Sequence, residues 1–200
     1  KSLYYESILR VMTHEIRNSI TPIASLSADL LKHLDPVPIS RQREGLEVIN
    51  SQAKNLTAFL DSYHRLTHLP EPEYKMVTIQ ALFTKLERLL QAEPGSERIV
   101  YSGGKAGKST DKELQIYGDV NLVTLALINL IRNALQAVEG QKDGIVRVDA
   151  YAGATGRLFI TITDSGPGIP PERLSAVFTP FYSTKSGGSG IGLPISQRIM

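Results

Sequence analysis

The chain of 200 residues contains no cysteine and is close to electrically neutral, and both shortages exclude classes of protein. Without cysteine there is no disulfide framework and no thiolate metal site, and the composition fits a reducing compartment. The formal net charge of +2 gives no reason to expect binding to nucleic acid or to a membrane surface. A hydrophobic content of 42% is ordinary for a folded chain of one or two domains.

Long apolar runs and targeting signals are also scarce. No apolar run approaches 18 residues and no signal peptide is present, so we expect no membrane-spanning segment and no direct membrane contact. An initiating methionine is missing as well, and the chain begins within a helical pattern, KSLYYESILR. This start indicates a piece of a longer protein.

What the chain does have, over residues 1–69, is the heptad spacing of a helical hairpin. Apolar side chains recur at intervals of three and four, with Ser19 as a gap, at Leu9, Met12, Ile16, Ile23, Leu26 and Leu30. A second stripe runs through Leu46, Ile49, Ala53, Leu56, Leu60 and Tyr63. Prolines within 35–38 separate the two stripes, which predicts two antiparallel helices, the first bent at Pro22. One hairpin cannot bury its own seam, so we predict a homodimeric four-helix bundle; the alternative is packing on the downstream domain.

His14 occupies the heptad position furthest from the apolar seam. It should therefore face solvent, with Glu15 beside it and Asn18 one turn further along the same side. Neutral histidine is a competent nucleophile, and a neighbouring carboxylate can fix its tautomer and raise its basicity. The alternative is a surface histidine without a function.

The sequence LPEPE at residues 69–73 is the clearest boundary, and we assign residues 70–200 to a second domain. Short strands are expected near 76–79, 98–102 and 114–117, with a helix over 79–92. Between the last two strands lies GGKAGKST, which resembles a phosphate loop. Ser102 stands where that motif requires glycine, so we interpret the segment as a flexible hairpin turn.

Residues 119–139 form an almost entirely apolar helix that Asp119 or Asn121 can cap. Asn129 and Asn133 interrupt it on one face, with Gln136 close by. Buried amides cost roughly 1–3 kcal/mol each unless they are hydrogen-bonded. They form either a polar network within the core or, as we favour, a surface for a polar ligand, since amide oxygens suit Mg²⁺ beside phosphates.

Two antiparallel strands, 144–151 and 157–163, lead to Asp164, which ends an apolar stripe. A carboxylate there can accept a hydrogen bond from an exocyclic amine such as that of adenine. Gly166 and Gly168 follow and allow a close approach of the backbone to a flat ligand. Further on, an aromatic segment leads to Lys185 and to glycines that run into a helix, an arrangement suited to phosphate oxygens.

Together the motifs resemble the catalytic core of two-component sensor histidine kinases. THEIRN at 13–18 resembles the H-box, NLIRNALQA at 129–137 the N-box and DSGPGI at 164–169 the G1 box, while FTPFYSTK at 178–185 resembles the F-box and GGSGIGL at 187–193 the G2 box. The resemblance implies an α+β fold, in which a dimeric helical hairpin precedes an α/β sandwich that binds ATP.

The resemblance also implies roles for single residues. His14 would accept phosphate, Glu15 would act as the general base, and Asn18 matches the position that assists dephosphorylation of the partner in bifunctional members. Asp164 would meet the adenine amine, and Asn133 with Asn129 would place Mg²⁺. The expected nucleotide contacts are Asn129, Asn133, Asp164, Gly166, Gly168, Phe178, Thr184, Lys185, Gly188, Gly190, Gly192 and Leu193.

Three departures from the family pattern concern Ser19, Gln136 and the end at Met200. Many members carry proline at the position of Ser19 and lysine at the position of Gln136, and the family continues with a further strand after the position of Met200.

We expect autophosphorylation from ATP with Mg²⁺, then transfer of the phosphoryl group to an aspartate of a response-regulator receiver domain. We expect this to take place in the cytoplasm, with the full-length protein able to be anchored in the inner membrane. The rivals are a non-catalytic dimeric scaffold that binds ATP and an ATPase or chaperone-like clamp of the same superfamily.

Overall fold

The computed structural model describes residues 2–32, 39–103, 113–153, 155–184 and 189–200. Its contacts divide the chain into two units, each of which is described by itself. One comprises residues 1–69 with 183–189, and the other comprises residues 70–182 with 190–200.

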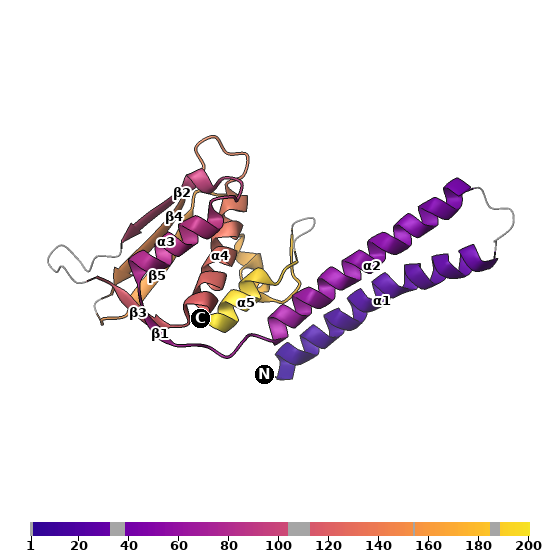
Figure 1. The fold of residues 1–200 in the computed structure, drawn as a ribbon, viewed down its shortest axis with the longest axis horizontal. Coiled ribbons are helices and arrows are strands. Elements are labelled where there is room, and N and C mark those ends of the chain that lie inside the picture. Colours follow the sequence, from indigo (N-terminus) through magenta and orange to yellow (C-terminus); the bar gives the residue numbers. More distant parts are fainter. Residues whose placement is uncertain (1, 33–38, 104–112, 154, 185–188) are drawn as a thin grey trace. The chain divides into compact units, whose positions relative to one another are not determined.

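The first unit is a pair of antiparallel helices, α1 (Ser2–Lys32) and α2 (Ile39–Thr67) (Figure 1). Along α1 the expected seam is confirmed over the stretch whose side chains are described, because its positions from Met12 to Leu30 are buried or half-buried. Ser19 is only 8% exposed and so lies within this seam. The helix continues through Pro22.

The stripe on α2 differs from the expected one. Ile49, Leu56 and Tyr63 are half-buried as expected, but three other members of the stripe are exposed: Leu46, Ala53 and Leu60. Gly45, one position earlier, lies against α1, where an added Cβ would sit 3.3 Å from Leu30 Cδ1. The helices therefore pack through Ile49, Leu56 and Tyr63 as predicted, but Gly45 replaces Leu46 at the contact. Leu46, Ala53 and Leu60, spaced by seven residues, stay exposed in the described structure.

The second unit contains two sheets, three α-helices and short 3₁₀ turns (Figure 1). Its elements are β1 (Lys75–Thr78), α3 (Ile79–Leu90), β2 (Ile99–Gly103), β3 (Gln115–Gly118), α4 (Val120–Ala137), β4 (Val146–Ala152), β5 (Leu158–Asp164) and α5 (Gly192–Ile199), with 3₁₀ turns at Ser96–Arg98, Pro171–Arg173 and Ala176–Phe178.

Strand pairing confirms one sequence prediction and corrects another. β4 and β5 are antiparallel neighbours, with Val148 opposite Ile162. The expected hairpin of β2 and β3 does not form, because β2 runs parallel to β4 and β3 pairs with β1. The reason is the core, in which the fully buried Val146 and Val148 make β4 the centre of the three-stranded sheet. Most of the GGKAGKST segment, residues 104–110, lies outside the described residues.

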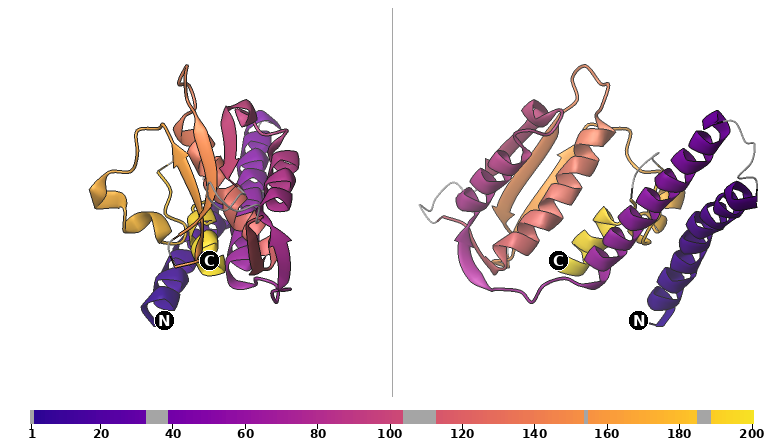
Figure 2. Two further views of the ribbon diagram at one scale, coloured as in Figure 1. Left: turned by 90° about the vertical axis from the view of Figure 1, so that its left-hand side faces the viewer. Right: turned by 45° about the vertical axis from the view of Figure 1, so that its right-hand side comes forward.

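The core lies between this sheet and helices α3 and α4, which run side by side over one face of the sheet (Figures 1 and 2). Leu82 and Leu86 of α3 and Ile131 of α4 are fully buried. By length and composition alone, α4 is the one helix in the described part of the chain that could cross a membrane. Within the second unit, however, it is the core helix, since Leu127 and Ile131 pack in the core.

Asp119, not Asn121, caps α4. Asp119 Oδ1 accepts hydrogen bonds from the backbone N–H groups of Asn121 at 2.7 Å and Leu122 at 3.0 Å. These donors, with that of Leu122 foremost, lower the pKa of the Asp119 carboxyl. The carboxylate is therefore held in its charged form at the positive end of the helix dipole.

Tyr101 offers a test of the core. Its hydroxyl is buried without a hydrogen-bond partner in the described part of the chain. Burial, together with the negative charge of Glu87, raises the pKa of Tyr101 to about 12. Tyr101→Phe removes the unpaired hydroxyl, so we expect the free energy of unfolding to rise by about 1 kcal/mol in urea titrations at pH 8.

The same substitution should change the dependence of stability on pH. Because the folded protein holds the Tyr101 proton more tightly than the unfolded chain, the free energy of unfolding is highest below the unfolded pKa of about 10. It falls as pH rises from there through about 12. Tyr101→Phe should therefore flatten the loss of stability between pH 10 and 12, whereas Tyr117→Phe, at a residue 70% exposed, should change neither quantity. A lower free energy of unfolding for Tyr101→Phe would show that the hydroxyl is bonded in solution.

Candidate functional site

His14 projects from α1 into solvent, with its side chain 72% exposed. The amide nitrogen Nδ2 of Asn18 lies 3.1 Å from His14 Nδ1, as expected for residues one helical turn apart. Glu15 Oε1 lies 3.5 Å from the same ring nitrogen, at the outer limit of a hydrogen bond. The three predicted residues are therefore brought together at one atom.

The two neighbours of Nδ1 require opposite tautomers of the ring. A contact with the Glu15 carboxylate requires a proton on Nδ1, which leaves Nε2 with a free lone pair and makes it the nucleophile. A hydrogen bond from the Asn18 amide requires an unprotonated Nδ1, which places the proton of the neutral ring on Nε2. The choice between these neighbours therefore decides whether Nε2 can attack an electrophile.

A second cluster of predicted residues is arranged along α4. Asn129 Nδ2 donates a hydrogen bond of 3.4 Å to the carbonyl oxygen of Gly192, the first residue of α5. A Cβ added to Gly192 would lie 3.6 Å from Asn129 Cβ. The start of α5 is therefore in contact with the first asparagine, and Leu193 beside it is half-buried.

The other glycine turn contacts the C-terminal end of the same helix. The N–H of Gly166 donates to Asp164 Oδ1 at 2.8 Å, and a Cβ on Gly166 would fall 2.8 Å from Ala137 Cβ. Only glycine can approach α4 this closely without displacing it. Asn129, Asn133 and Ala137 are spaced by four residues, so the two turns mark out about 12 Å of one helix face.

The glycine loop before α5 is joined to the aromatic segment. Phe181 N–H donates to the Gly190 carbonyl at 2.9 Å. Gly190 has a φ of 62°, and a Cβ there would lie 2.5 Å from the Phe181 carbonyl carbon, so no other residue fits. Phe181 itself has a φ of 66°, an uncommon backbone conformation for a bulky residue.

For the remaining predicted residues that it describes, the structure gives backbone conformation or exposure. Gly168 has a φ of 75° with open space around its Cβ position, so it serves the turn and not a close contact. Phe178 is 42% exposed and Thr184 is exposed. Lys185 and Gly188 lie outside the described residues.

The sequence analysis missed Ser196 on α5. Its hydroxyl is buried and lies within hydrogen-bond distance of two carbonyl oxygens, that of Ala126 at 3.1 Å and that of Gly192 at 3.0 Å. This contact fixes α5, and with it the end of the glycine loop, on α4. No periodicity marks a single serine whose partner lies 70 residues away.

These residues fit Mg-ATP in their donor chemistry. Asn129 and Asn133 are half-buried, so their amide oxygens are accessible to a metal ion that takes few protein ligands beside phosphates. Asp164 is exposed at the end of β5, where its carboxylate can accept a hydrogen bond from a ligand amine.

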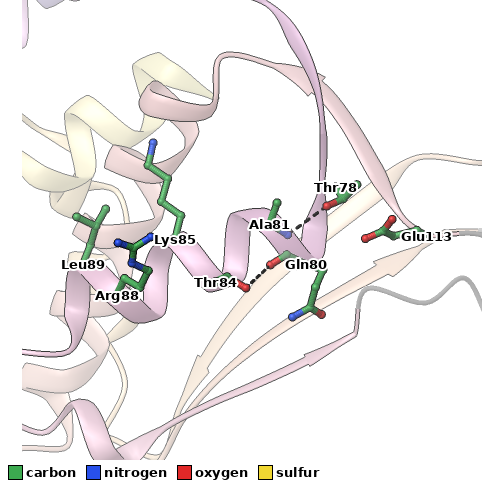
Figure 3. A pocket seen from close by; sticks show the side chains of 8 residues that line it. All are labelled: Thr78, Gln80, Ala81, Thr84, Lys85, Arg88, Leu89 and Glu113. Carbon is green, nitrogen blue, oxygen red and sulfur yellow. Dashed lines mark hydrogen bonds between the residues drawn. The ribbon is translucent and has the colours of Figure 1, made fainter.

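A groove of about 770 Å³ lies elsewhere in the second unit, along α3 (Figure 3). Lys85 and Arg88 make it basic, and Lys85 Nζ donates to Asn121 Oδ1 at 2.7 Å. Its lining consists of Thr78, Gln80, Ala81, Thr84, Lys85, Arg88, Leu89 and Glu113. None of the predicted site residues contributes to it, so the groove is separate from the candidate site.

Relatives are similar over nearly the whole chain. Sensor histidine kinase ZraS of Salmonella typhimurium is 31% identical over 189 residues, covering 94% of this chain and 39% of that protein. Sporulation kinase C of Bacillus subtilis is 29% identical over 189 residues, covering 94% of this chain and 42% of that protein. The chain thus spans about two-fifths of the length of these relatives.

Solved structures show the same fold. Histidine kinase ThkA, in a crystal structure with the response regulator protein TrrA, has a TM-score of 0.61 at 24% identity, over 100% of this chain and 55% of that chain. A family model described as "Histidine kinase-, DNA gyrase B-, and HSP90-like ATPase" matches residues 118–200. Residues 118–200 therefore match that ATPase family, and the whole chain has the organisation of a histidine kinase catalytic core, in which a helical hairpin precedes an ATP-binding domain.

Proposed function

We propose that this chain phosphorylates its own His14 from Mg-ATP and passes the phosphoryl group to an aspartate of a response-regulator receiver domain. The observation that carries the proposal is the exposed imidazole, with Glu15 and Asn18 both at Nδ1. The similarity to proteins named sensor histidine kinases supports it. So does the fold shared with ThkA, which was crystallised with a response regulator.

In the proposed reaction, Nε2 of His14 attacks the γ-phosphorus while Nδ1–H faces Glu15. The new bond is P–N, the bond that breaks joins the γ-phosphorus to the bridging oxygen, and ADP leaves with the electron pair. Glu15 acts as the general base for the Nδ1 proton, which prevents positive charge from accumulating on the ring. Catalysis is mostly positioning, as in phosphoryl transfer generally.

The nucleotide would lie along the face of α4 between the two glycine turns. Asp164 would accept a hydrogen bond from the adenine amine, and Gly188, Gly190 and Gly192 would surround the phosphates. Asn133 with Asn129 would hold Mg²⁺, which supplies neutralisation of the phosphate charge.

Two finer parts of the proposal concern assembly and dephosphorylation of the partner. A homodimer would cover the exposed stripe Leu46, Ala53 and Leu60 on α2, which is unpartnered in the single chain. Asn18, whose amide lies 3.1 Å from the acceptor ring, would also assist removal of phosphate from the receiver aspartate. Autophosphorylation consumes ATP and its phosphoryl group passes to a receiver domain, and we place both steps in the cytoplasm.

Labelling with γ-³²P ATP tests the proposal. With Mg²⁺ the protein should acquire label that is stable to base and labile to acid, the behaviour of a P–N bond. Chelation of Mg²⁺ with EDTA should reduce the label to background because the phosphate charge is no longer neutralised. Binding of ATP without any label would favour the rival function, a non-catalytic dimeric scaffold.

A further inference from the structure

The connector between α2 and β1, residues 68–74, is hydrogen-bonded to the second unit through the backbone N–H of Glu73. Helical hydrogen bonding ends at His68, whose N–H donates to His64 O at 2.8 Å. Pro70 and Pro72 have no N–H to donate. At the end of the connector, the N–H of Glu73 donates to Asp119 Oδ2 at 2.7 Å.

Asp119 uses its two oxygens for two different purposes. Oδ1 caps α4 through Asn121 and Leu122, whereas Oδ2 accepts only the Glu73 N–H among the bonds of the described chain. Asp119 is 8% exposed, so water competes little for these bonds. The bond to Glu73 spans 46 residues of sequence and adds nothing to the cap itself.

Neighbouring contacts continue from this bond into the sheet. Tyr74 stacks on Tyr117 with ring centroids 5.6 Å apart, and Lys75 stands opposite Gly118 in the β1–β3 ladder. Lys75 Nζ also contacts Glu73 Oε2 at 3.0 Å, but both side chains are exposed and such a pair contributes little. The bond from the Glu73 N–H to Asp119 thus adds one hydrogen bond to the β1–β3 pairing, just beyond its last residue pair, Lys75 and Gly118.

We propose that Asp119 is a positioning residue of the kinase reaction, which fastens the end of the connector to the nucleotide-binding unit. It touches neither ATP nor His14. By bonding Glu73, Asp119 leaves only residues 69–72 as the unbonded connector. This connector is the tether between the hairpin that carries His14 and the unit that carries the nucleotide site. This inference rests on the proposed function, since it concerns the rate at which bound ATP reaches His14.

The physical argument concerns effective concentration. Without the bond, the free segment lengthens from residues 69–72 to residues 69–74, and each added residue extends the reach by roughly 3.3–3.6 Å. A longer and less directed tether lowers the effective concentration of bound γ-phosphate at the acceptor. The affinity for ATP should not change, because the predicted nucleotide contacts lie elsewhere on α4 and on the glycine turns.

Two substitutions remove the bond from its two sides. Asp119→Asn keeps one oxygen for the cap, a position that accepts asparagine as well as aspartate, but presents an NH₂ to the Glu73 N–H. Glu73→Pro deletes the donor itself. Glu73→Ala is the matched control, because it keeps the N–H and removes only the side chain that contacts Lys75.

We expect Asp119→Asn and Glu73→Pro to lower the rate of autophosphorylation at saturating ATP about twofold, because the free segment grows from four residues to six and effective concentration falls roughly as the −3/2 power of length. Glu73→Ala should label at the wild-type rate, and the Kd for ATP should be unchanged in all three. In hydrogen-exchange NMR the Glu73 amide should be protected in the wild type and should exchange as in a free chain in Asp119→Asn.

Three outcomes would overturn the inference. The first is a Glu73 amide that exchanges freely in the wild type, and the second is variants that all label at the rate of Glu73→Ala. The third is a parallel loss of labelling rate and ATP affinity, because Asp119 would then act only through folding of the nucleotide site. A wild-type protein that takes no label defeats the proposed function instead, and the exchange measurement still decides whether Asp119 holds Glu73.

Discussion

His14→Gln should abolish covalent labelling from γ-³²P ATP, down to the background of a sample without protein. Glutamine is a good helix former and remains polar, so α1 should be preserved, but its amide cannot act as the nucleophile. Isothermal titration should show unchanged affinity for ATP, since His14 is not among the predicted nucleotide contacts and most of these lie in the other unit. The combination of lost label and intact binding would assign the acceptor.

His64→Gln provides the matched control for this experiment. His64 is also an exposed helix residue, and it stacks on His68 with ring centroids 4.5 Å apart. Its replacement should leave the label unchanged. Label that persists in His14→Gln and disappears in His64→Gln would show that the acceptor has been assigned to the wrong helix.

Asp164→Asn should have the largest effect on nucleotide binding. Asp164 Oδ1 already accepts the Gly166 N–H at 2.8 Å. An asparagine whose oxygen keeps that bond must turn its NH₂ towards the ligand, where a donor would face the adenine amine. A hydrogen bond to a charged group contributes about 1.5–3 kcal/mol, so we expect the Kd for ATP to rise by roughly 10- to 150-fold.

The control for this substitution is Asp143→Asn, at an exposed aspartate in the turn before β4. It makes the same change of charge, so it separates the local hydrogen bond from any general electrostatic effect. The Kd for ATP should stay within twofold. Asp164→Asn that binds ATP as the wild type does would remove the adenine contact from the proposal.

The local features of the site could be predicted because they depend on helical spacing alone. His14 and Asn18 are four residues apart, so any helix through them brings the side chains together. The same holds for Asn129 and Asn133 on α4. The cap at Asp119 was foreseen, as one of two candidates, from the residue type at the start of an apolar helix.

Pairing over long distances could not be predicted in the same way. β2 and β3 look like a hairpin in the sequence because they follow each other, but each finds its partner elsewhere. The second oxygen of Asp119 and the hydroxyl of Ser196 are bonded to backbone groups 46 and 70 residues away. A single hydrogen bond between distant segments leaves no periodic trace in a sequence.

The exposed stripe on α2 illustrates a third kind of difference. The heptad pattern identified the apolar positions correctly but did not say which of them face α1. Gly45 faces α1 at Leu30, so the next residue, Leu46, lies outside the contact and is exposed. The sequence pattern alone therefore combined two neighbouring surfaces into one.

The two glycine turns that contact α4 have a consequence for the selection of ligands. Gly192 lies against Asn129 and Gly166 against Ala137, so both turns are set by one helix packed in the core. The separation between them cannot be adjusted by either loop independently. In the proposed site, α4 would therefore fix the distance between the base and the phosphates of the nucleotide, and we expect molecules with a different spacing to bind less tightly than ATP.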